Sequence, residues 1–357
     1  MTYLFTPMRL RSTTVRNRVW VAPMCQYSAV DGVPNDWHLV HLGSFARGGA
    51  GLVLTEATAV SPEGRISPAD TGIWNDEQAR AWSRIVDFVH GQGATAGMQL
   101  AHAGRKASTR PPFEGRGPVS VEDGGWEAVG PSAEAFPGLP APRELTAAEI
   151  DEVVRDFAEA ARRALQVGFD VLEIHAAHGY LLHEFLSPLS NRRDDEYGGS
   201  FDNRVRLLLR VVDAVRSAVP ASTPLLVRIS ATDWVDGGWS VDDSVALARL
   251  LREADVDLVD VSSGGNAVAD IPVGPGYQVS FARRIREEAG IATGAVGLVT
   301  EPKQAEEIVA GGAADVVLLA RAMLRDPHWA LRAAHDLGVP VGDGVDWPKQ
   351  YLRAALD

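Results

Sequence analysis

Eight short runs rich in apolar and β-branched residues recur along the chain, and each is followed by a longer stretch of helical periodicity. The runs are RVWVAP (18–23), GLVLTEA (51–57), TAGMQLA (95–101), FDVLEIHA (169–176), PLLVRIS (224–230), VDLVDVSS (256–263), IATGAV (291–296) and DVVLLAR (315–321). Nearly continuous apolar strands that alternate with helices are typical of a parallel sheet covered by helices. Eight such units close a barrel, so we predict an α/β protein with the (β/α)8 TIM-barrel fold.

Two of the intervening stretches carry helix-start signals. Asn75 with Gln78 and Thr146 with Glu149 each have capping-box spacing, and both stretches end at glycine. A doubly wound open sheet is the rival fold. It usually carries G-x-G-x-x-G or a P-loop after an early strand. Neither pattern occurs in this chain, which favours the barrel.

The chain has 357 residues, whereas a barrel of this class typically needs about 250. Much of the surplus lies in residues 102–145, where Pro and Gly gather in RPPFEGRGP and FPGLPAP. We predict one barrel domain spanning residues 1–357, with a long insertion at 102–145 after the third strand and a C-terminal tail at 336–357.

Composition excludes several classes of protein. With 34 basic and 47 acidic residues the net charge is -13, so nucleic acid is not an expected partner. The single cysteine, Cys25, excludes an internal disulfide and a cysteine-held iron–sulfur cluster. No run approaches the ~20 apolar residues of a membrane span, and the first twenty residues do not resemble a signal peptide. We therefore expect a cytoplasmic protein with no membrane partner.

Polar residues fall at the ends of several predicted strands. These include Cys25, Gln99, His175 and Arg228. In a barrel the C-terminal strand ends meet at one face and carry the active site. An amide, an arginine, a thiol and small residues suit a planar, hydrogen-bonding organic ligand with a phosphate better than they suit a cation.

A phosphate site is indicated after the last two strands. Gly297 in GAVGLVT and Arg321 in LLAR occupy positions where barrels commonly bind phosphate through exposed backbone N–H groups. Arg321 would add charge-assisted hydrogen bonds. The alternative is that the glycine serves a tight turn and Arg321 is a surface charge.

Gln99 and Arg228 each have two interpretations. An unpaired amide at the end of an apolar strand is unfavourable, so Gln99 must bind either loop backbone or the edge of a ligand. A buried guanidinium needs an anionic partner or several acceptors. For Arg228 that partner could be a flavin ring, whose N1 side becomes negative on reduction, or an acidic residue in a structural ion pair.

The segment EIHAAHGYLLHEF holds His175, His178 and Tyr180 at the end of the fourth strand. A metal on the two histidines would need a third ligand, for which His183 or Glu184 is nearest. Alternatively, two imidazole N–H groups could stabilise one substrate oxygen, with Tyr180 as a proton donor. A purely structural role for the histidines is the third option.

Taken in order, the motifs resemble the old yellow enzyme family of flavin-dependent ene-reductases over nearly the whole chain. The match is nearest to the bacterial subgroup with a cysteine beside the flavin. The segments that carry it are APMCQYSAVDGVPNDWHLVHL, GAGLVLTEATAV, QLAHAGRKAS, HAAHGYLLHEFLSPLSNRRDDEYGGSFDNR, PLLVRIS, GYQVSFARRIR, TGAVGLVT and RAMLRDPHWA. The fourth of these is highly specific, whereas single pieces such as TGAVG are weak.

The resemblance implies non-covalent flavin mononucleotide (FMN), with NADPH as hydride donor and NADH possible. It implies an NADPH dehydrogenase that reduces the activated C=C bond of unsaturated ketones, aldehydes or imides. His175 and His178 would hold the substrate carbonyl, Tyr27 would lie beside it and Tyr180 would give the proton. Other residues would surround the flavin ring: Pro23, Met24, Cys25, Ala57, Gln99 and Arg228. Gly297, Ala320 and Arg321 would bind the phosphate, with Ala320 standing where the family often has Gly.

The tail WPKQYLRAALD resembles one that inserts an arginine into a neighbouring subunit's pocket, and Arg353 is the matching residue. A frayed terminal helix is the alternative. A homodimer or homotetramer is therefore expected. The main rival function is a metal-dependent TIM-barrel hydrolase or lyase that uses His175 and His178.

Overall fold

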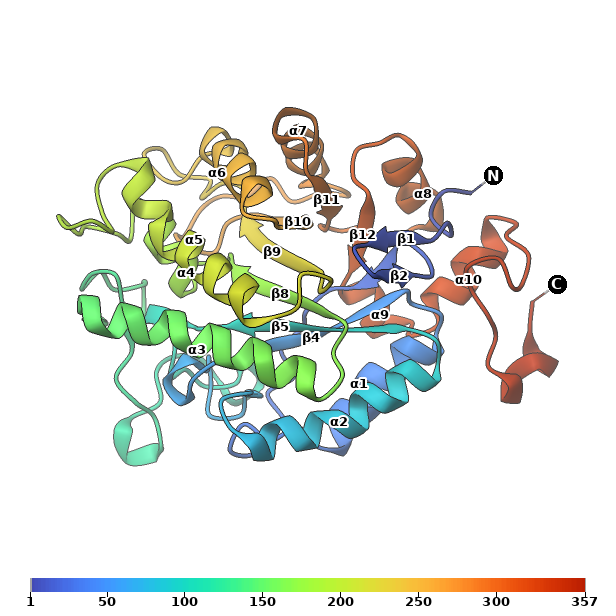
Figure 1. The fold of residues 1–357 in the computed structure, drawn as a ribbon, viewed down its shortest axis with the longest axis horizontal. Coiled ribbons are helices and arrows are strands. Elements are labelled where there is room, and N and C mark those ends of the chain that lie inside the picture. The colour runs from blue at the N-terminus through green and yellow to red at the C-terminus, as the bar shows by residue number, and fades with distance from the viewer. Residues whose placement is uncertain (1, 357) are drawn as a thin grey trace.

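The computed structural model describes residues 2–356 and contains a closed barrel of eight parallel strands (Figure 1). The strands, in order around the barrel, are β3 (Val19–Val21), β4 (Leu52–Ala59), β5 (Thr95–Ala101), β8 (Val171–Ala176), β9 (Leu225–Ser230), β10 (Leu258–Ser262), β11 (Ala292–Ala295) and β12 (Val316–Leu319). Each falls within or beside one of the eight predicted runs, so the predicted fold is confirmed. Met1 and Asp357, the outer limits of the predicted domain and tail, lie outside the described residues.

Helices surround the barrel (Figure 1). They are α1 (Asp36–Arg47), α2 (Asp76–Gly91), α3 (Ala147–Gln166), α4 (Leu181–Leu186), α5 (Phe201–Ala218), α6 (Val241–Glu253), α7 (Val279–Ala289), α8 (Pro302–Ala310), α9 (Arg321–Arg325) and α10 (Trp329–Asp336). Both predicted capping boxes are present, at the starts of α2 and α3. The outward side chains of the strands, such as Ile174, join the buried layer between barrel and helices.

The barrel interior is closed at its N-terminal end by apolar side chains. Inward-facing residues of six strands form one buried cluster there: Trp20, Leu52, Val171, Leu226, Leu258 and Val316. A short antiparallel hairpin, β1 (Met8–Leu10) with β2 (Thr13–Val15), adds Leu10 and Val15 to the same cluster. This end of the barrel is therefore a packed floor.

The insertion follows β5 as predicted. It contains three short 3-10 turns and a pair of two-residue strands, β6 (Val129–Gly130) and β7 (Arg143–Glu144). Its Trp126 stacks on Arg65, whose guanidinium carbon lies 4.7 Å from that ring and 5.4 Å from the ring of Trp74. Phe113 packs edge-to-face on Tyr27 with ring centroids 6.2 Å apart. The insertion thus borders the loop that follows β3.

Both chain termini lie at one end of the molecule in Figure 1, away from the loops that follow the barrel strands. The tail forms a 3-10 turn over Lys349–Ala354, and the Tyr351 hydroxyl accepts a hydrogen bond from Arg47 Nη1 at 2.8 Å. Arg47 ends α1, so the tail packs near the N-terminal end of the barrel.

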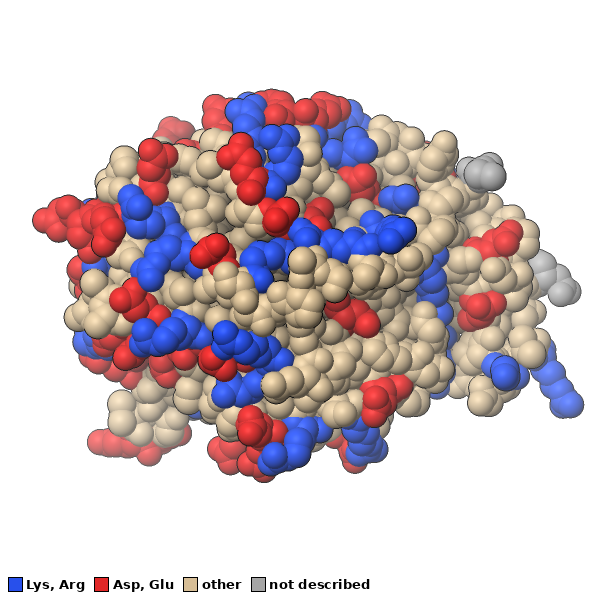
Figure 2. All heavy atoms as spheres, in the orientation of Figure 1, with Lys and Arg blue, Asp and Glu red and all other residues tan. Residues whose placement is uncertain are grey.

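On the face shown in Figure 2, acidic and basic side chains are intermixed over the helical layer. The acidic residues that give the chain its net charge of -13 are therefore interspersed with basic residues on this face. Within residues 2–356, no helix combines the length and apolarity needed to cross a membrane.

Candidate active site

Above the apolar floor, the barrel interior changes to a buried polar layer. Gln99 Nε2 donates to Glu173 Oε1 at 2.8 Å, between the paired strands β5 and β8. On the next two strands, Arg228 Nε lies 2.9 Å from Asp260 Oδ2, although the oxygen is off the N–H axis. Both carboxyl groups are fully buried. Burial, and then the charge of Asp260, raise the pKa of Glu173 to about 8.

This layer provides protein partners for both Gln99 and Arg228. The amide nitrogen of Gln99 binds a neighbouring carboxyl group, which is neither loop backbone nor a ligand edge. Arg228 forms the structural ion pair, but only through Nε, and no protein acceptor for Nη1 or Nη2 occurs among the described residues. The outer edge of the guanidinium is therefore available to a further partner.

The histidine pair lies one layer further toward the C-terminal strand ends. His175 precedes the last residue of β8, and its ring lies 5.2 Å from both the His178 ring and the Tyr180 ring, measured between centroids. His175 Nδ1 is buried without a hydrogen-bond partner in the described chain. His178 Nε2 is 2.7 Å from Ser262 Oγ, at the end of β10. The structure thus brings together the three predicted residues.

Electrostatics keep all three side chains neutral at pH 7. Burial, and then the positive charge of Arg228, lower the pKa of His175 and His178 well below the usual range. A neutral imidazole has one N–H donor and one acceptor nitrogen. Burial, and then the nearby Cys25, raise the pKa of Tyr180 well above its usual value, so its hydroxyl keeps its proton. Two hydrogen-bond donors and one proton donor therefore converge.

The two candidate third ligands for a metal have other contacts. His183 Nδ1 accepts a hydrogen bond from Gly179 N at 2.9 Å, and His183 Nε2 lies 3.0 Å from Asp233 Oδ1. Glu184 Oε1 accepts from the backbone N of Arg105 at 2.8 Å. Between residues 2 and 356 no group of three or more His, Cys, Asp or Glu side chains has the arrangement of a metal site.

The loop after β3 forms the rim opposite the histidines. Pro23, Met24, Cys25 and Tyr27 are all partly exposed there, and Cys25, Tyr27 and Tyr180 pack on a small cluster that includes Ala57 and Ala101. Burial, and then the charge of Asp70, raise the pKa of Cys25 well above the ordinary value, so it is a thiol rather than a thiolate.

Two features of β4 fix the position of the loop that forms this rim. The pairing of β4 with β5 shifts between Leu54 and Ala57, and this bulge brings Ala57 into the rim cluster. Glu56, beside the shift, is buried, and its Oε2 accepts a hydrogen bond from the backbone N of Gln26 at 3.1 Å. The bulge therefore links the second barrel strand to the loop that carries Cys25.

A cavity of about 130 Å³ lies beyond the ends of β11 and β12. Gly297 has φ +121°, and a Cβ added there would lie 2.9 Å from Gln278 Nε2. Ala320 lines the cavity, and the exposed Arg321 and Arg325 border it. Ser262 also lines this cavity, and the same hydroxyl contacts His178. Ser262 therefore connects the cavity lined by the predicted phosphate residues to His178.

Sequence reasoning missed several residues of this site. A role for Ser262 could have been inferred from its place at a strand end, beside residues already selected. Glu173 and Asp260 are charged residues inside apolar strands, which is itself a signal of a buried polar network. Gln278 comes from the start of a helix and lies in the segment GYQVSFARRIR, which carried the resemblance but was not assigned a site role.

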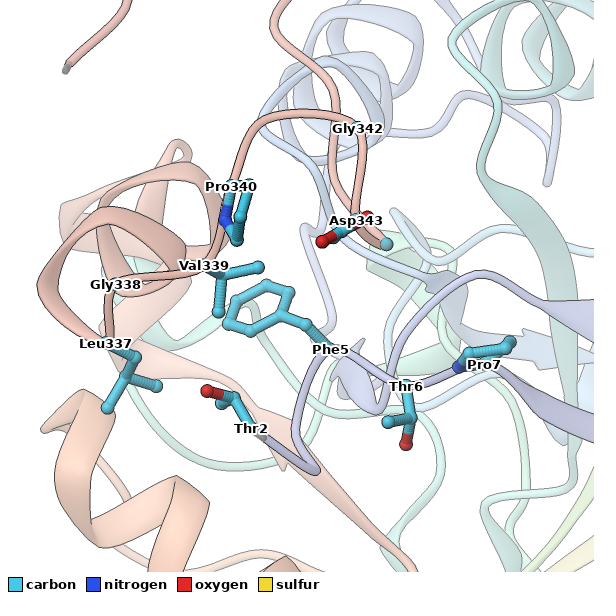
Figure 3. Close-up of a pocket in the computed structure, with 11 residues that line it drawn as sticks. Thr2, Phe5, Thr6, Pro7, Leu337, Gly338, Val339, Pro340, Gly342 and Asp343 are labelled. Carbon is cyan, nitrogen blue, oxygen red and sulfur yellow. The ribbon is translucent and has the colours of Figure 1, made fainter.

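A larger hollow, of about 620 Å³, lies between the N-terminal segment and residues 337–344 (Figure 3). Of the described residues that line it, Asp343 has the one titratable side chain, and the others are apolar, glycine or threonine. This hollow is at the floor end of the barrel and holds none of the predicted site residues.

The residues fit an FMN-type ligand on three observations of this structure. Gly297 leaves the space that a Cβ would fill, in a cavity bordered by two arginines. The unpaired His175 Nδ1 is a buried polar atom without a partner in the described chain. The outer nitrogens of Arg228 are available beside the same strand ends. These groups suit the phosphate and the hydrogen-bonding ring of such a ligand.

Comparison with known proteins gives consistent matches. Residues 3–339 match the model of the NADH:flavin oxidoreductase / NADH oxidase family. An NADPH dehydrogenase of Listeria innocua is 48% identical over 357 residues, covering 99% of both chains. The old yellow enzyme homologue from Zymomonas mobilis has TM-score 0.79 and 29% identity, covering 99% of both chains. Morphinone reductase in complex with tetrahydroNAD has TM-score 0.78 and 29% identity, covering 94% of this chain and 91% of its own.

Proposed function

The chain belongs to the NADH:flavin oxidoreductase / NADH oxidase family, which includes old yellow enzyme, and we propose that it is an NADPH-dependent ene-reductase. It is an FMN-dependent oxidoreductase by family. Its proposed substrates are α,β-unsaturated ketones, aldehydes or imides, reduced at the C=C bond. NADPH as electron donor is supported by the name of the Listeria innocua relative, and NADH remains possible.

We assign the proposed FMN contacts as follows. Gly297, Ala320 and Arg321 would hold the phosphate at the 130 Å³ cavity. A second group would surround the ring: Pro23, Met24, Cys25, Ala57, Gln99 and Arg228. When bound, FMN supplies a hydride that it first receives from the nicotinamide donor. Gln99 is held in place by Glu173, and Arg228 by Asp260, so both are oriented before any ligand enters.

His175 and His178 bind the substrate carbonyl oxygen in this proposal. Each neutral imidazole can offer one N–H, and two such donors withdraw electron density from the conjugated system. The β-carbon then becomes the electron-poor position. His178 Nε2 contacts Ser262 Oγ in the structure, so the orientation of this ring is already fixed by the protein.

Tyr180 is the proposed proton donor to the α-carbon. Its hydroxyl is kept protonated by burial, and its ring lies 5.2 Å from the His175 ring, so it faces the same molecule that the histidines hold. A positioned acid of this kind contributes a factor of about 10² to 10⁴ to the rate. Tyr27, on the opposite rim, is proposed to contact the substrate from the other side.

Arg353 is proposed to act in a second copy of the chain. It is exposed on the tail, which packs on α1 near the floor end of its own barrel. It therefore lies at the end opposite its own histidine pair and can serve only a neighbouring site. This supports the expectation of a homodimer or homotetramer.

The observation that carries the proposal is the grouping of two neutral imidazoles and a protonated tyrosine beside a glycine-lined cavity. The test is anaerobic rapid mixing of the purified yellow holoenzyme, first with NADPH and then with 2-cyclohexen-1-one. We expect two separate half-reactions and ping-pong kinetics. A requirement for a ternary complex would contradict the proposal. A colourless protein that chelators inhibit would instead support the metal-dependent hydrolase or lyase.

A further inference from the structure

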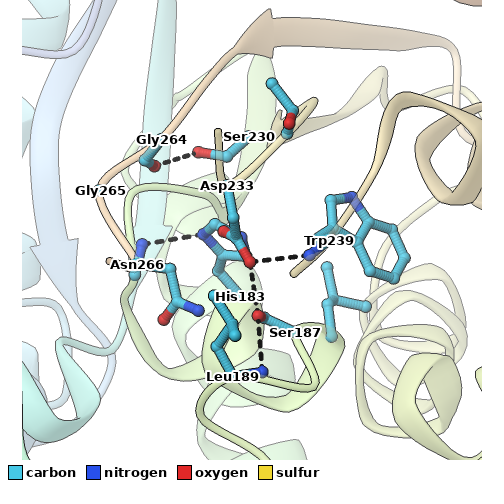
Figure 4. Close-up of polar contacts among 12 residues, drawn as sticks. His183, Ser187, Leu189, Ser230, Asp233, Trp239, Gly264, Gly265 and Asn266 are labelled. Carbon is cyan, nitrogen blue, oxygen red and sulfur yellow. Dashed lines mark hydrogen bonds and ion pairs between the residues drawn. The ribbon is translucent and has the colours of Figure 1, made fainter. Parts of the chain in front are cut away.

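We propose that Asp233 and His183 form a positioning pair that fixes the loop bearing His178 and Tyr180. The inference rests on the proposed function, because it gives residues outside the substrate site a positioning role in the same reaction. Neither residue is among the proposed contacts of FMN or substrate. Both side chains are fully buried, between α4 and the loop that follows β9 (Figure 4).

The contacts of the pair lead directly to the catalytic loop. His183 Nδ1 accepts from the backbone N of Gly179 at 2.9 Å, and Gly179 stands between His178 and Tyr180. On the other side of the ring, His183 Nε2 lies 3.0 Å from Asp233 Oδ1, off the N–H axis. A carboxylate at this distance still attracts the ring proton.

Asp233 is itself held by two donors. Its Oδ2 accepts from Ser187 Oγ at 2.5 Å and from the backbone N of Trp239 at 2.8 Å (Figure 4). Burial opposes the charge on Asp233, but the facing His183 ring and the hydrogen bonds from Ser187 and Trp239 outweigh it and lower the pKa of Asp233, so the carboxylate is charged at pH 7. The orientation of Asp233 is therefore set by groups that do not belong to the catalytic loop.

The ring of His183 can make these contacts in only one neutral tautomer. The N–H of Gly179 points at Nδ1, which must present its lone pair, so the proton is on Nε2, facing Asp233. Which imidazole nitrogen carries the proton is commonly set by the partner of the other nitrogen. Asp233 therefore determines whether His183 can hold Gly179.

The held loop has an uncommon backbone. His178 has φ +60°, a conformation that residues with a side chain seldom adopt, and Gly179 follows with φ +69°. A Cβ on Gly179 would lie 2.3 Å from Gly265 O, so the two loops pack backbone to backbone. Ser230 Oγ accepts from His178 N at 2.9 Å, and Lys106 Nζ donates to His178 O at 2.7 Å.

These contacts hold different backbone groups of the loop. Ser230 holds the N–H of His178, and the next peptide unit, which joins His178 to Gly179, is held at its carbonyl by Lys106 and at its N–H by His183. If the Gly179 contact is lost, the turn can relax from positive φ, and the directions of both the His178 ring and the Tyr180 hydroxyl change. The pair would thus act on substrate geometry and not on FMN binding.

The test is Asp233→Asn in the holoenzyme. Asn keeps the size and can still accept from Trp239 and Ser187 with its carbonyl oxygen, which places its NH2 group against His183 Nε2. Two donors then face each other, the imidazole proton moves to Nδ1, and Gly179 loses its acceptor. We expect kcat for enone reduction to fall about 10- to 100-fold, as for other residues that orient functional side chains from outside the site.

Two further readouts separate positioning from a general structural role. Phenol, titrated into the oxidised holoenzyme, should bind more weakly to Asp233→Asn, because its oxygen uses the same imidazole donors. The Gly179 amide should exchange hydrogen faster, measured by mass spectrometry of peptides spanning the loop. FMN content and the FMN dissociation constant should remain those of the unsubstituted protein.

Matched variants complete the design. Ser187→Ala removes one of the two donors to Asp233 but leaves the Trp239 contact and the carboxylate facing the imidazole, so kcat and phenol affinity should fall much less than in Asp233→Asn. His183→Ala should behave as Asp233→Asn. His183→Gln offers an acceptor and a donor on one amide group, so it should retain more activity than His183→Ala. It also keeps the proposal testable if Asp233→Asn does not fold.

The proposal is overturned if Asp233→Asn loses thermal stability but keeps the turnover, phenol affinity and Gly179 exchange of the unsubstituted holoenzyme. It is also overturned if His183→Gln and His183→Ala are equally impaired. Failure of the proposed function looks different. The unsubstituted holoenzyme itself would then leave the enone unreduced, while phenol titration and amide exchange would still report on the loop.

Discussion

The two ends of this barrel differ in a way that cavity size does not reveal. The floor end has the larger hollow, about 620 Å³, but among residues 2–356 a single carboxylate is the only titratable side chain that lines it. The C-terminal end has a cavity of about 130 Å³ beside two imidazoles, a tyrosine and an arginine with free outer nitrogens. The candidate active site of this molecule is therefore identified by its unpaired polar atoms and shifted pKa values, and not by the volume of its cavity.

The difference arises within single strands. On β8 the inward positions run from Val171 through Glu173 to His175, and on β9 from Leu226 through Arg228 to Ser230. Because side chains two apart share a face, each strand passes from floor to polar layer to active-site edge within five residues. The strands thus provide a rigid support for the polar groups at one end only.

The largest effect expected at the C-terminal end comes from Tyr180→Phe. Loss of the proton donor should slow reduction of the enone by a factor of about 10² to 10⁴. Reduction of FMN by NADPH should be nearly unchanged, because that step needs no proton from Tyr180. Stopped-flow absorbance of the two half-reactions measures both. An equal loss in both half-reactions would refute the assigned role.

His178→Ala should have the next largest effect. Removing one of two donors to a developing negative charge typically lowers kcat by about 10² to 10³. Steady-state rates with an enone and a phenol titration of the oxidised enzyme should both show the loss. A variant with unchanged phenol affinity would show that the imidazole does not face the ligand.

Gly297→Ala tests the phosphate end of the same site. The new Cβ would require φ near +121° and would approach Gln278 Nε2 at 2.9 Å. Backbone strain of this kind is typically about 1 to 3 kcal/mol, which corresponds to roughly tenfold or more in the FMN dissociation constant. Flavin fluorescence during titration of apoprotein measures it. Undiminished FMN affinity would place the phosphate elsewhere.

Glu184 gives the C-terminal end of the barrel a pH-dependent contribution to stability. Burial raises its pKa from 4.5 to about 8, so between these values the folded state holds a proton that the unfolded state has lost. Stability should therefore fall as pH rises through this window, by roughly 1 kcal/mol per pH unit. Glu184→Gln should flatten the slope, which denaturant titrations at pH 5 to 8 can detect. A slope identical in both proteins would contradict the assignment.

The smallest effect is expected at the floor. Asp343 is exposed and far from the histidine pair, so Asp343→Asn should leave both half-reactions, phenol affinity and FMN affinity unchanged. The same assays serve as the control for the four preceding variants. A clear loss of activity would mean that the larger hollow participates in function.

The fold could be predicted because each strand coincides with a short apolar run that is visible in the local sequence. The eight apolar runs are strands of the barrel, and Asn75 and Thr146 begin helices as their capping boxes indicate. These signals depend only on neighbouring residues. The residues at the strand ends then follow from topology, which is how His175 and Gly297 were selected as members of one site.

The partners of those residues could not be predicted. Gln99 binds Glu173 and Arg228 pairs with Asp260 across neighbouring strands, and only the register of the barrel decides which carboxyl group is within reach. His183 was considered as a metal ligand because it follows His178 closely in sequence. Its contact with Asp233, 50 positions later, depends on how two loops pack.

The most direct measurement is a visible absorption spectrum of the purified protein during titration with phenol. A phenolate whose oxygen is held by the two imidazoles should stack on bound FMN and give a long-wavelength charge-transfer band. This band should disappear in His175→Ala/His178→Ala. A flavin-free protein that contains stoichiometric zinc, or a band that survives in the double variant, would contradict the assignment of these histidines to substrate.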